Sequence, residues 1–256
     1  MIESRIGFCT LVRREVVRYF VVWTQTLVPP LISTALFIFV FGFSIGKNLQ
    51  VAIHGVRYLD FLVPGLVSMH LIESAYTNSS SSLFMSRWHN MIQEVLLSPL
   101  SYFEMVLALL LGSLSRALIV SAGVWGISLL FTHFQFQHPW VVAYFAVVIA
   151  TLFASLGLLA GLWAEGYEKL SVWGTFVLTP LIYFGGVFHS IDMVPAPLQI
   201  LTHLDPIFYL VNGMRYGMLG LSDAPLGVCM AVAGFLALGF FAWVIFLFKI
   251  GYKLRT

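Results

Sequence analysis

Few side chains in this sequence could do chemistry, and the most notable ones lie inside long apolar stretches. Glu73 and Arg116 fall near the middle of two successive apolar segments, residues 59–84 and 104–131. Ionisable residues within membrane spans usually face the bundle and pair with one another. We therefore predict a structural ion pair between Glu73 and Arg116. His70 lies one helical turn from Glu73 and could join that pair, or the three residues could serve a polar path or a proton relay.

Two short strings resemble catalytic motifs without their context. Gly42-x-Ser44-x-Gly46 matches a nucleophile elbow, which requires a strand–turn–helix and a histidine within reach of the serine. Only His70 lies at membrane depth in a facing segment, so an intramembrane hydrolase at Ser44 is a remote alternative. Lys47 follows a glycine, but Asn48 comes next, and a phosphate-binding loop needs Ser or Thr there. We expect no catalytic site and no ATPase site in this chain.

The sequence offers no pattern for a metal or a cofactor. Its seven histidines lack metal-ligand spacing, and Cys9 and Cys229 are too far apart for a metal motif or a disulfide framework. The formal net charge is only +2. We expect no bound metal, no cofactor and no nucleic-acid partner.

The composition places the chain in the lipid bilayer. Hydrophobic residues make up 60% of the sequence and charged residues 9%, and the mean hydropathy is +0.94. Ordinary soluble domains carry about 25% charged residues. A span needs about 20 apolar residues, and this predicts an all-α polytopic membrane protein, a single domain over residues 1–256, with six spans at 27–45, 59–84, 104–131, 139–163, 171–188 and 226–248.

The distribution of basic residues predicts the orientation. Nine of the thirteen Lys and Arg residues fall before the first span, in the loops 85–103 and 164–170, or after the last span, and three fall on the other side. Positive residues gather on the cytoplasmic side of membrane proteins. We expect both termini to be cytoplasmic.

Residues 1–26 are too polar to cross the bilayer. On a helix, one face would carry Phe8, Val12, Val16, Tyr19 and Trp23, with Arg14 and Arg18 opposite. This pattern predicts a helix lying in the membrane interface with its basic side toward anionic headgroups. A plain solvated leader is the alternative.

Residues 189–223 form a long segment that its prolines divide. Pro195 and Pro197 predict the start of one short helix, and Asp205-Pro206 predicts an N-cap and first turn of another, which Gly220 would end. We expect two short helices at or dipping into the outer leaflet.

Two clusters of small residues predict packing. Gly157-x-x-x-Gly161 in the fourth span would allow another helix to approach closely. The run Ser79 to Ser82 would bond back to carbonyls of its own helix.

The stretch from Met85 to Glu104 is amphipathic in the middle of an apolar protein. We predict a short helix over residues 87–97 that ends near Ser98, because Pro99 cannot continue it. Ser101-x-x-Glu104 then satisfies a capping box ahead of the next apolar run. Such a stiff elbow between two spans would transmit a push from a partner protein, although an ordinary amphipathic connector fits the same pattern.

Three motifs resemble those of the ABC-2 type transporter family, membrane subunits that pair with a separate ATPase. They are Leu59–Leu66 with Pro64 and Gly65, Glu94–Leu100 with Pro99, and a spaced series that contains Gly185, Gly186, Pro195, Pro206 and Arg215. They follow the order of the family, and the resemblance covers nearly the whole chain.

The resemblance implies a function that the residues alone do not. It implies a permease subunit of an exporter, working as a homodimer with an ABC-type ATPase that binds the ATP. It also implies that residues 85–103 are a coupling helix and that the N-terminal helix completes the ATPase contact. On that basis we predict coupling residues Arg87, Glu94, Arg13 and Arg14. A secondary transporter using Glu73 and His70 remains an alternative.

Overall fold

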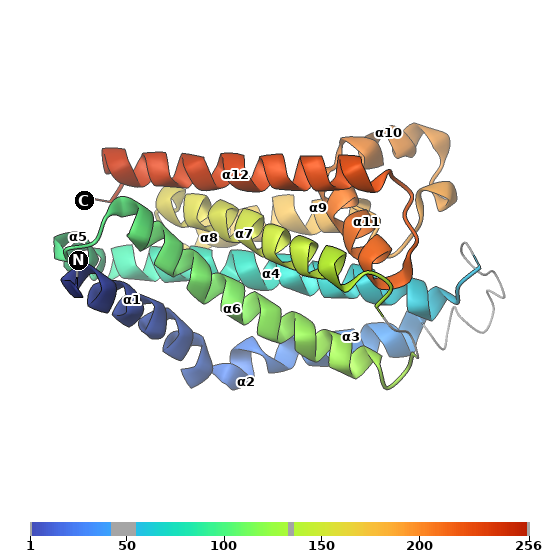
Figure 1. The fold of residues 1–256 in the computed structure, drawn as a ribbon, viewed down its shortest axis with the longest axis horizontal. Coiled ribbons are helices and arrows are strands. Elements are labelled where there is room, and N and C mark those ends of the chain that lie inside the picture. Colours follow the sequence, from blue (N-terminus) through green and yellow to red (C-terminus); the bar gives the residue numbers. More distant parts are fainter. Residues whose placement is uncertain (1, 42–54, 133–135, 255–256) are drawn as a thin grey trace.

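The computed structural model describes residues 2–41, 55–132 and 136–254, and within these ranges the regular elements are helices (Figure 1). The predicted all-α class is confirmed in the described residues. The α-helices are α1 (Ile2–Val21), α2 (Trp23–Thr26), α3 (Val28–Phe39), α4 (Tyr58–Trp88), α5 (Ile92–Leu97), α6 (Tyr102–Ser128), α7 (Pro139–Trp163), α8 (Tyr167–Val172), α9 (Thr179–Phe184), α10 (Ala196–Leu204), α11 (Pro206–Leu219) and α12 (Leu226–Ile250), with the π-helix η2 (Trp173–Leu178) between α8 and α9 and a 3-10 turn η3 (Ile191–Met193).

The long helices run side by side along the longest axis of the molecule. Figure 1 shows α4 in the middle, with α6, α7 and α12 along it, and places both termini and α5 at one end. We call this the basic end, because the predicted cytoplasmic Lys and Arg residues within the described ranges belong to its segments. Helices α10 and α11 lie toward the opposite end.

Helix α4 is the core of the bundle and is buried on nearly every side. A side-chain Cβ at Gly157 of α7 would lie 2.5 Å from the backbone oxygen of Tyr76 and 2.1 Å from Ser79 Oγ. The glycine therefore allows α7 to touch the backbone of α4, as the small-residue motif predicts.

Within the described ranges, three single helices are long and apolar enough to cross a membrane, namely α6, α7 and α12. The pair Ser4–Val21 and Trp23–Phe39, bent by 81°, would be a fourth if it counts as one broken span. Helix α4 is longer than any of these, but Asp60, Glu73 and its polar residues lower its mean hydropathy. These side chains are tolerated because most of α4 faces protein. The predicted span 171–188 lies in α8, η2 and α9, and the end of the predicted first span, residues 42–45 with Ser44, lies outside the described residues.

The face that the N-terminal helix buries overlaps the predicted one only in part. Leu11, Glu15 and Tyr19 are its buried residues, and Phe8 and Val12 pack beside Leu11, while Trp23 is exposed in α2. The helix packs along α6, where a Cβ at Gly112 would lie 2.4 Å from the Cβ of Glu15. The predicted stripe did not include Glu15, a carboxylate with buried partners that lies at the centre of this contact.

The two predicted short helices between residues 189 and 223 are confirmed as α10 and α11. Asp205 Oδ1 accepts a hydrogen bond from Ile207 N at 2.8 Å, and Gly220 ends α11 with a φ of 74°. Helix α11 is not a surface helix, however, since it packs against α4, α7 and α12 with most of its residues buried.

Candidate functional site

The elbow between α4 and α6 differs from the single predicted helix over residues 87–97. Helix α4 continues to Trp88, a turn follows at His89–Met91, and α5 begins at Ile92. Asn90 takes a φ of 58°, a left-handed conformation that asparagine tolerates better than most residues. As predicted, α5 ends at Leu97, just before Ser98 and Pro99.

The exit from the elbow is fixed by the predicted capping box. Ser101 Oγ accepts from the backbone N–H of Glu104 at 3.2 Å, and the Glu104 carboxylate accepts from Ser101 N at 2.8 Å. The same carboxylate accepts a bond from Ser4 Oγ at 2.6 Å. The start of α1 is thereby tied to the start of α6.

A small apolar cluster joins the N-terminal helix to the elbow. Its buried members are Leu11 of α1, Val95 of α5, and Met105 and Ala108 of α6, and Leu96 and Leu100 are among the residues that pack against them. The N-terminal helix, α5 and the start of α6 therefore form one packed unit at the basic end.

The outer surface of the elbow is exposed and partly apolar. Leu97 is 87% exposed, Trp88 and Met91 are also exposed, and Glu94 lies on the same short helix as Leu97. A large apolar side chain that stands in solvent beside polar neighbours is typical of a protein contact. Arg13 is exposed on α1, whereas Arg14 donates to Glu15 Oε1 at 3.2 Å.

Arg87 does not point outward from the elbow. Its Nη1 donates to the carbonyl oxygens of Gly161 and Leu162 at 2.8 Å each, and to that of Ala164 at 3.2 Å. These belong to the end of α7, where helix carbonyls lack partners within the helix. Arg87 thus holds α4 to α7, which corrects its predicted position on the contact surface.

A buried polar cluster connects α1, α4 and α6. Glu15, 1% exposed, accepts from Ser82 Oγ at 2.5 Å and from Arg18 Nε at 3.3 Å. Arg18 also donates to the Asn78 side chain at 2.9 Å, and Arg116 Nη1 lies 3.4 Å from the same Asn78 oxygen. Arg116 therefore contacts an amide in place of the predicted Glu73.

The prediction of an ion pair between Glu73 and Arg116 is wrong, because each of these residues contacts a different partner. Glu73 Oε2 lies 3.4 Å from Nδ1 of His70, one turn away on the same helix. Helical direction explains the difference, because Arg116 faces the side of α4 that holds Asn78 and Glu73 faces another side. The alternative association of His70 with Glu73 is confirmed as a contact.

Glu73 opens into a groove of about 410 Å³ between α4 and the segment formed by α8, η2 and the start of α9. We call it the hydroxyl-lined groove, since beside Glu73 and Tyr76 it is lined by Thr77, Ser80, Ser81, Tyr167, Ser171, Thr175 and Thr179.

Ser79, Ser80 and Ser81 donate hydrogen bonds to carbonyls of α4, as predicted, while the Ser82 hydroxyl donates to Glu15 instead. The Tyr76 hydroxyl has no hydrogen-bond partner among the described residues.

The motif residues of the opposite end meet around Arg215, which is 1% exposed. Its Nη2 donates to the carbonyl of Gly186 at 2.7 Å, its Nη1 lies 3.8 Å from Asp223 Oδ2, and its Cζ lies 3.9 Å from the ring centre of Phe61. Gly186 has a φ of 78°, and a Cβ at Gly65 would lie 2.2 Å from the carbonyl oxygen of Val187. These glycines bring the 185–188 segment onto α4.

Three other motif prolines lie within a helix or at the start of one. Pro64 lies inside α4, where its carbonyl accepts from Ser68 Oγ at 2.8 Å. Pro195 caps α10 and Pro206 starts α11. The motif residues of this end are therefore architectural in this chain.

Sequence reasoning missed Glu15 and Asn78. Glu15 directly follows Arg13 and Arg14, and Asn78 directly precedes the run Ser79 to Ser82, so neither residue stands out from its neighbours in the sequence. The available signal was that Glu15, Leu11 and Tyr19 recur at the spacing of one helix face. Among the described residues, no group of three His, Cys, Asp or Glu side chains could hold a metal ion.

Comparison with known proteins gives the family. Residues 7–219 match the model of the ABC-2 type transporter family. The chain is 42% identical over 214 residues to the inner membrane transport permease YadH of Escherichia coli K12, covering 83% of both chains. It is 23% identical over 189 residues to nodulation protein J of Rhizobium meliloti, covering 72% of this chain and 71% of the relative.

The chain belongs to the ABC-2 type transporter family. It is a transport permease and a multi-pass protein of the bacterial inner membrane. The resemblance inferred from the three sequence motifs is confirmed.

Proposed function

We propose that this chain is the permease subunit of an ATP-driven exporter. Two copies would form the path, a separate ABC-type ATPase would bind and hydrolyse ATP, and α5 would be the coupling helix. The observation that carries this proposal is the elbow: an exposed apolar and acidic surface at the basic end, fixed rigidly to α4, α6 and α1.

The positive-inside rule supports a cytoplasmic position for this end. An ATPase could dock there against Leu97, Met91 and Glu94, with Arg13 at the edge of the contact. Because α5 packs on α1 and continues through the capping box into α6, a displacement of α5 would be delivered to both helices. Tightly packed elements shift between discrete arrangements rather than deforming smoothly.

Six spans remain our proposal for the topology. In this reading, α3, α4, α6, α7, the α8–α9 segment and α12 cross the bilayer, and α1 lies in the interface. The 81° bend between α1 and the following helices supports the interfacial position.

The hydroxyl-lined groove supports a second copy of the chain. Glu73 and a row of hydroxyls lie among helices of the membrane domain, and polar groups at that depth face protein or a water-filled cavity rather than lipid. A second copy across the groove would convert it into a closed aqueous path.

The test is purification of the tagged full-length chain from its native membranes in mild detergent. We expect an ATPase subunit to accompany it and ATP hydrolysis to follow. Leu97→Ser and Glu94→Lys should reduce the bound ATPase at least tenfold, while Leu130→Ser should not. Leu130 is a matched control, since it is 78% exposed at the other end of α6. Loss of the ATPase with Leu130→Ser, or full retention with Leu97→Ser, would contradict the docking surface.

One observation favours a second candidate, a proton-coupled transporter. His70 and Glu73 are in contact, and Glu73 opens into the hydroxyl-lined groove, which is the arrangement of a proton relay. That reading requires transport without an ATPase and its loss on addition of a protonophore. Glu73→Gln would then abolish transport, whereas the ATP-driven reading expects only a partial loss. For the hydrolase alternative, Ser44 lies outside the described residues and nothing else supports it.

A further inference from the structure

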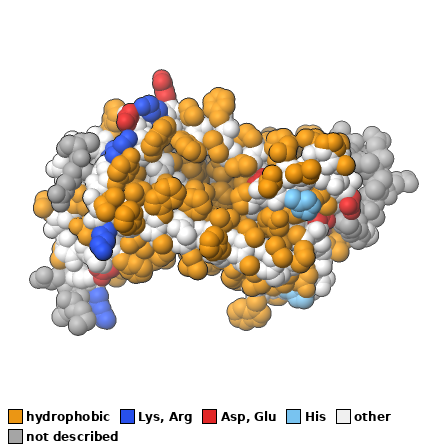
Figure 2. Space-filling model, turned by 90° about the horizontal axis from the view of Figure 1, so that it is seen from above, with side chains coloured by type: hydrophobic (Ala, Val, Ile, Leu, Met, Phe, Trp, Pro, Cys, Tyr) orange, Lys and Arg blue, Asp and Glu red, His pale blue; other side chains and the backbone are white. Residues whose placement is uncertain are grey.

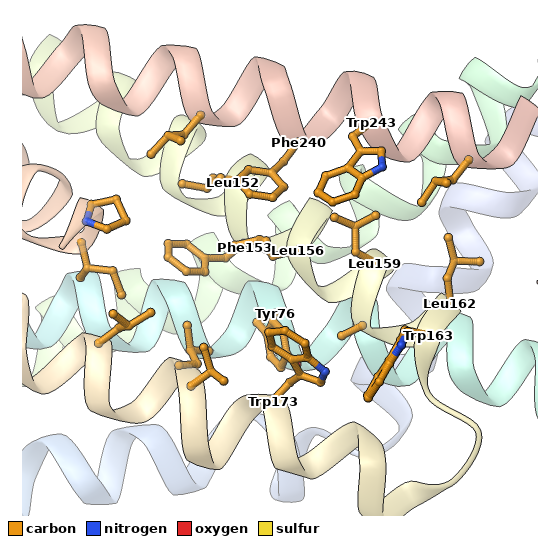
Figure 3. A pocket seen from close by; sticks show the side chains of 18 of the residues that line it. Tyr76, Leu152, Phe153, Leu156, Leu159, Leu162, Trp163, Trp173, Phe240 and Trp243 are labelled. Carbon is orange, nitrogen blue, oxygen red and sulfur yellow. The ribbon is translucent and has the colours of Figure 1, made fainter. Parts of the chain in front are cut away.

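A second groove lies on the other side of the α8–α9 segment and is almost wholly apolar. Its volume is about 660 Å³, with Trp173 and Val177 of η2 on one wall, Leu236 and Trp243 of α12 on the other, and α7 as the floor. Figure 3 shows Trp173 of η2, Trp243 of α12 and Phe153 of α7 around one space between the three helices. The segment from Tyr167 to Phe184 thus separates an apolar groove from the hydroxyl-lined one.

The groove has the length of one bilayer leaflet. Along α7 its lining runs from Leu152 to Trp163, and along α12 from Leu236 to Leu247. Eleven helical residues rise about 17 Å, and half of the hydrocarbon core is about 15 Å thick. Pro206 and Ile207, the first two residues of α11, also line the groove. A tail that enters from the basic end would therefore reach about the middle of the membrane.

Water is a poor occupant of such a space. At about 30 Å³ per molecule the groove has room for about twenty waters, yet its lining offers these waters few polar partners. Apolar cavities of proteins stay dry and accept apolar ligands. The shape and the lining therefore suit an elongated apolar chain.

The mouth at the basic end carries positive charge and aromatic rings. Lys253 Nζ lies 3.4 Å from the carbonyl oxygen of Trp163, which lines the groove, and 3.3 Å from Glu165 Oε1. Lys169 bonds the same carboxylate, and these bonds hold the pKa of Glu165 below its ordinary value. Lys249 is exposed one turn earlier, so the mouth keeps a net positive charge. Figure 2 shows blue Lys and Arg side chains, with red Asp and Glu side chains beside them, toward this end of a largely hydrophobic face.

We infer that the apolar groove binds one acyl chain of an anionic phospholipid of the bilayer, whose phosphate lies at Lys253 and Lys169. Trp163 and Trp243 then occupy the depth at which aromatic side chains gather in membrane proteins. Basic pockets between helices on the cytoplasmic side are a known form of recognition for acidic headgroups. The lipid fills the space between the α8–α9 segment and α12 and so supports a segment whose side chains are mostly exposed.

The test is native mass spectrometry of the full-length protein, extracted in mild detergent from bilayers of equal parts phosphatidylglycerol and phosphatidylcholine. We expect one phosphatidylglycerol per chain to remain bound after detergent washing. Leu236→Trp fills the groove and should reduce that bound lipid at least tenfold. Leu238→Trp is the matched control, because it lies two residues along α12, is 70% exposed and does not line the groove; it should retain the lipid as wild type does.

Two further variants keep the inference testable. Val177→Trp fills the groove from the opposite wall and serves if Leu236→Trp does not fold, as judged by size-exclusion chromatography and circular dichroism. Lys253→Gln should lower the preference for phosphatidylglycerol over phosphatidylcholine about fivefold, the effect of one basic residue near an anionic lipid surface. Wild-type levels of lipid in both filled variants, or equal retention of the two lipids by wild type, would overturn the inference. The readout needs no ATPase, so it fails or succeeds independently of the proposed function.

Discussion

Arg215 and Arg13, at the two ends of this protein, lie in opposite surroundings. At the opposite end, Arg215 is enclosed by Gly186, Asn212, Asp223 and the ring of Phe61. At the basic end, Arg13 is exposed, and the elbow presents Leu97 and Glu94 to solvent. Arg215 has its contacts within the chain, whereas Arg13, Leu97 and Glu94 are exposed and available for contact with another protein. The difference indicates where this domain is held together and where it is available to a partner.

Substitution of Arg215 should have the largest effect on stability. Arg215→Met removes a buried guanidinium from the carbonyl, carboxylate and ring that surround it, and breaking such a set costs about 3–5 kcal/mol. Unfolding in detergent, followed by circular dichroism, measures the loss. Arg57→Ala is the control, because the Arg57–Asp60 pair is exposed and such pairs contribute about 0–1 kcal/mol. Equal losses in the two variants would mean that the enclosure of Arg215 is not what stabilises this end.

Glu15 tests whether the basic end also has a buried polar anchor. Glu15→Ala removes the acceptor of the Ser82 hydroxyl and one of the acceptors of Arg18, which keeps its bond to Asn78. Such a loss costs about 2 kcal/mol. The same unfolding assay applies, with Glu94→Ala as the exposed control. If Glu15→Ala is as stable as that control, α1 is held by its apolar contacts alone.

The capping box should contribute less. Ser101→Ala removes the side-chain acceptor of the Glu104 N–H, which costs about 1 kcal/mol at a helix N-cap. Ser101→Asp supplies another good capping side chain and should recover most of the stability. If Ser101→Asp is as unstable as Ser101→Ala, the stability depends on another contact of the Ser101 hydroxyl and not on helix capping.

Leu97 should give the smallest effect on stability and a clear effect on coupling. Leu97→Ser removes a side chain that contacts little of its own chain, so the free energy of unfolding should change by no more than about 0.5 kcal/mol. ATP-dependent transport by the reconstituted complex should nevertheless fall, because the docking surface has lost its largest exposed apolar group. A destabilised Leu97→Ser protein would place Leu97 in the fold rather than at a partner.

The comparison of the ends also separates what could be predicted from what could not. Local signals predicted their structures well: Pro99 ended α5, Ser101 and Glu104 formed a capping box, and Asp205-Pro206 began α11. Each depends on a few neighbouring residues and on backbone geometry. The Gly157 contact was predictable as a close approach, although its partner helix was not.

Partner choice was the part that failed. Glu73 and Arg116 lie at similar depths on successive helices, and this suggested a pair. Two residues at the same depth in the membrane can still point to different sides of their helices. Here Arg116 contacts Asn78, and Glu73 contacts His70. Arg87 was predicted to lie on the contact surface, but its guanidinium donates hydrogen bonds to backbone carbonyls at the C-terminal end of α7.

By itself, the sequence determined the all-helical membrane class, the family, the short helices of residues 189–223 and the amphipathic elbow. These depend on composition, on turn and cap chemistry and on motif order, all of which are local or linear properties. Only the tertiary structure decided that Glu15 is buried, that Arg87 caps α7, and that the α8–α9 segment divides an apolar groove from a hydroxyl-lined one. Those features depend on the rotation of each helix about its axis and on the distance between helices, which are fixed by packing of the whole bundle.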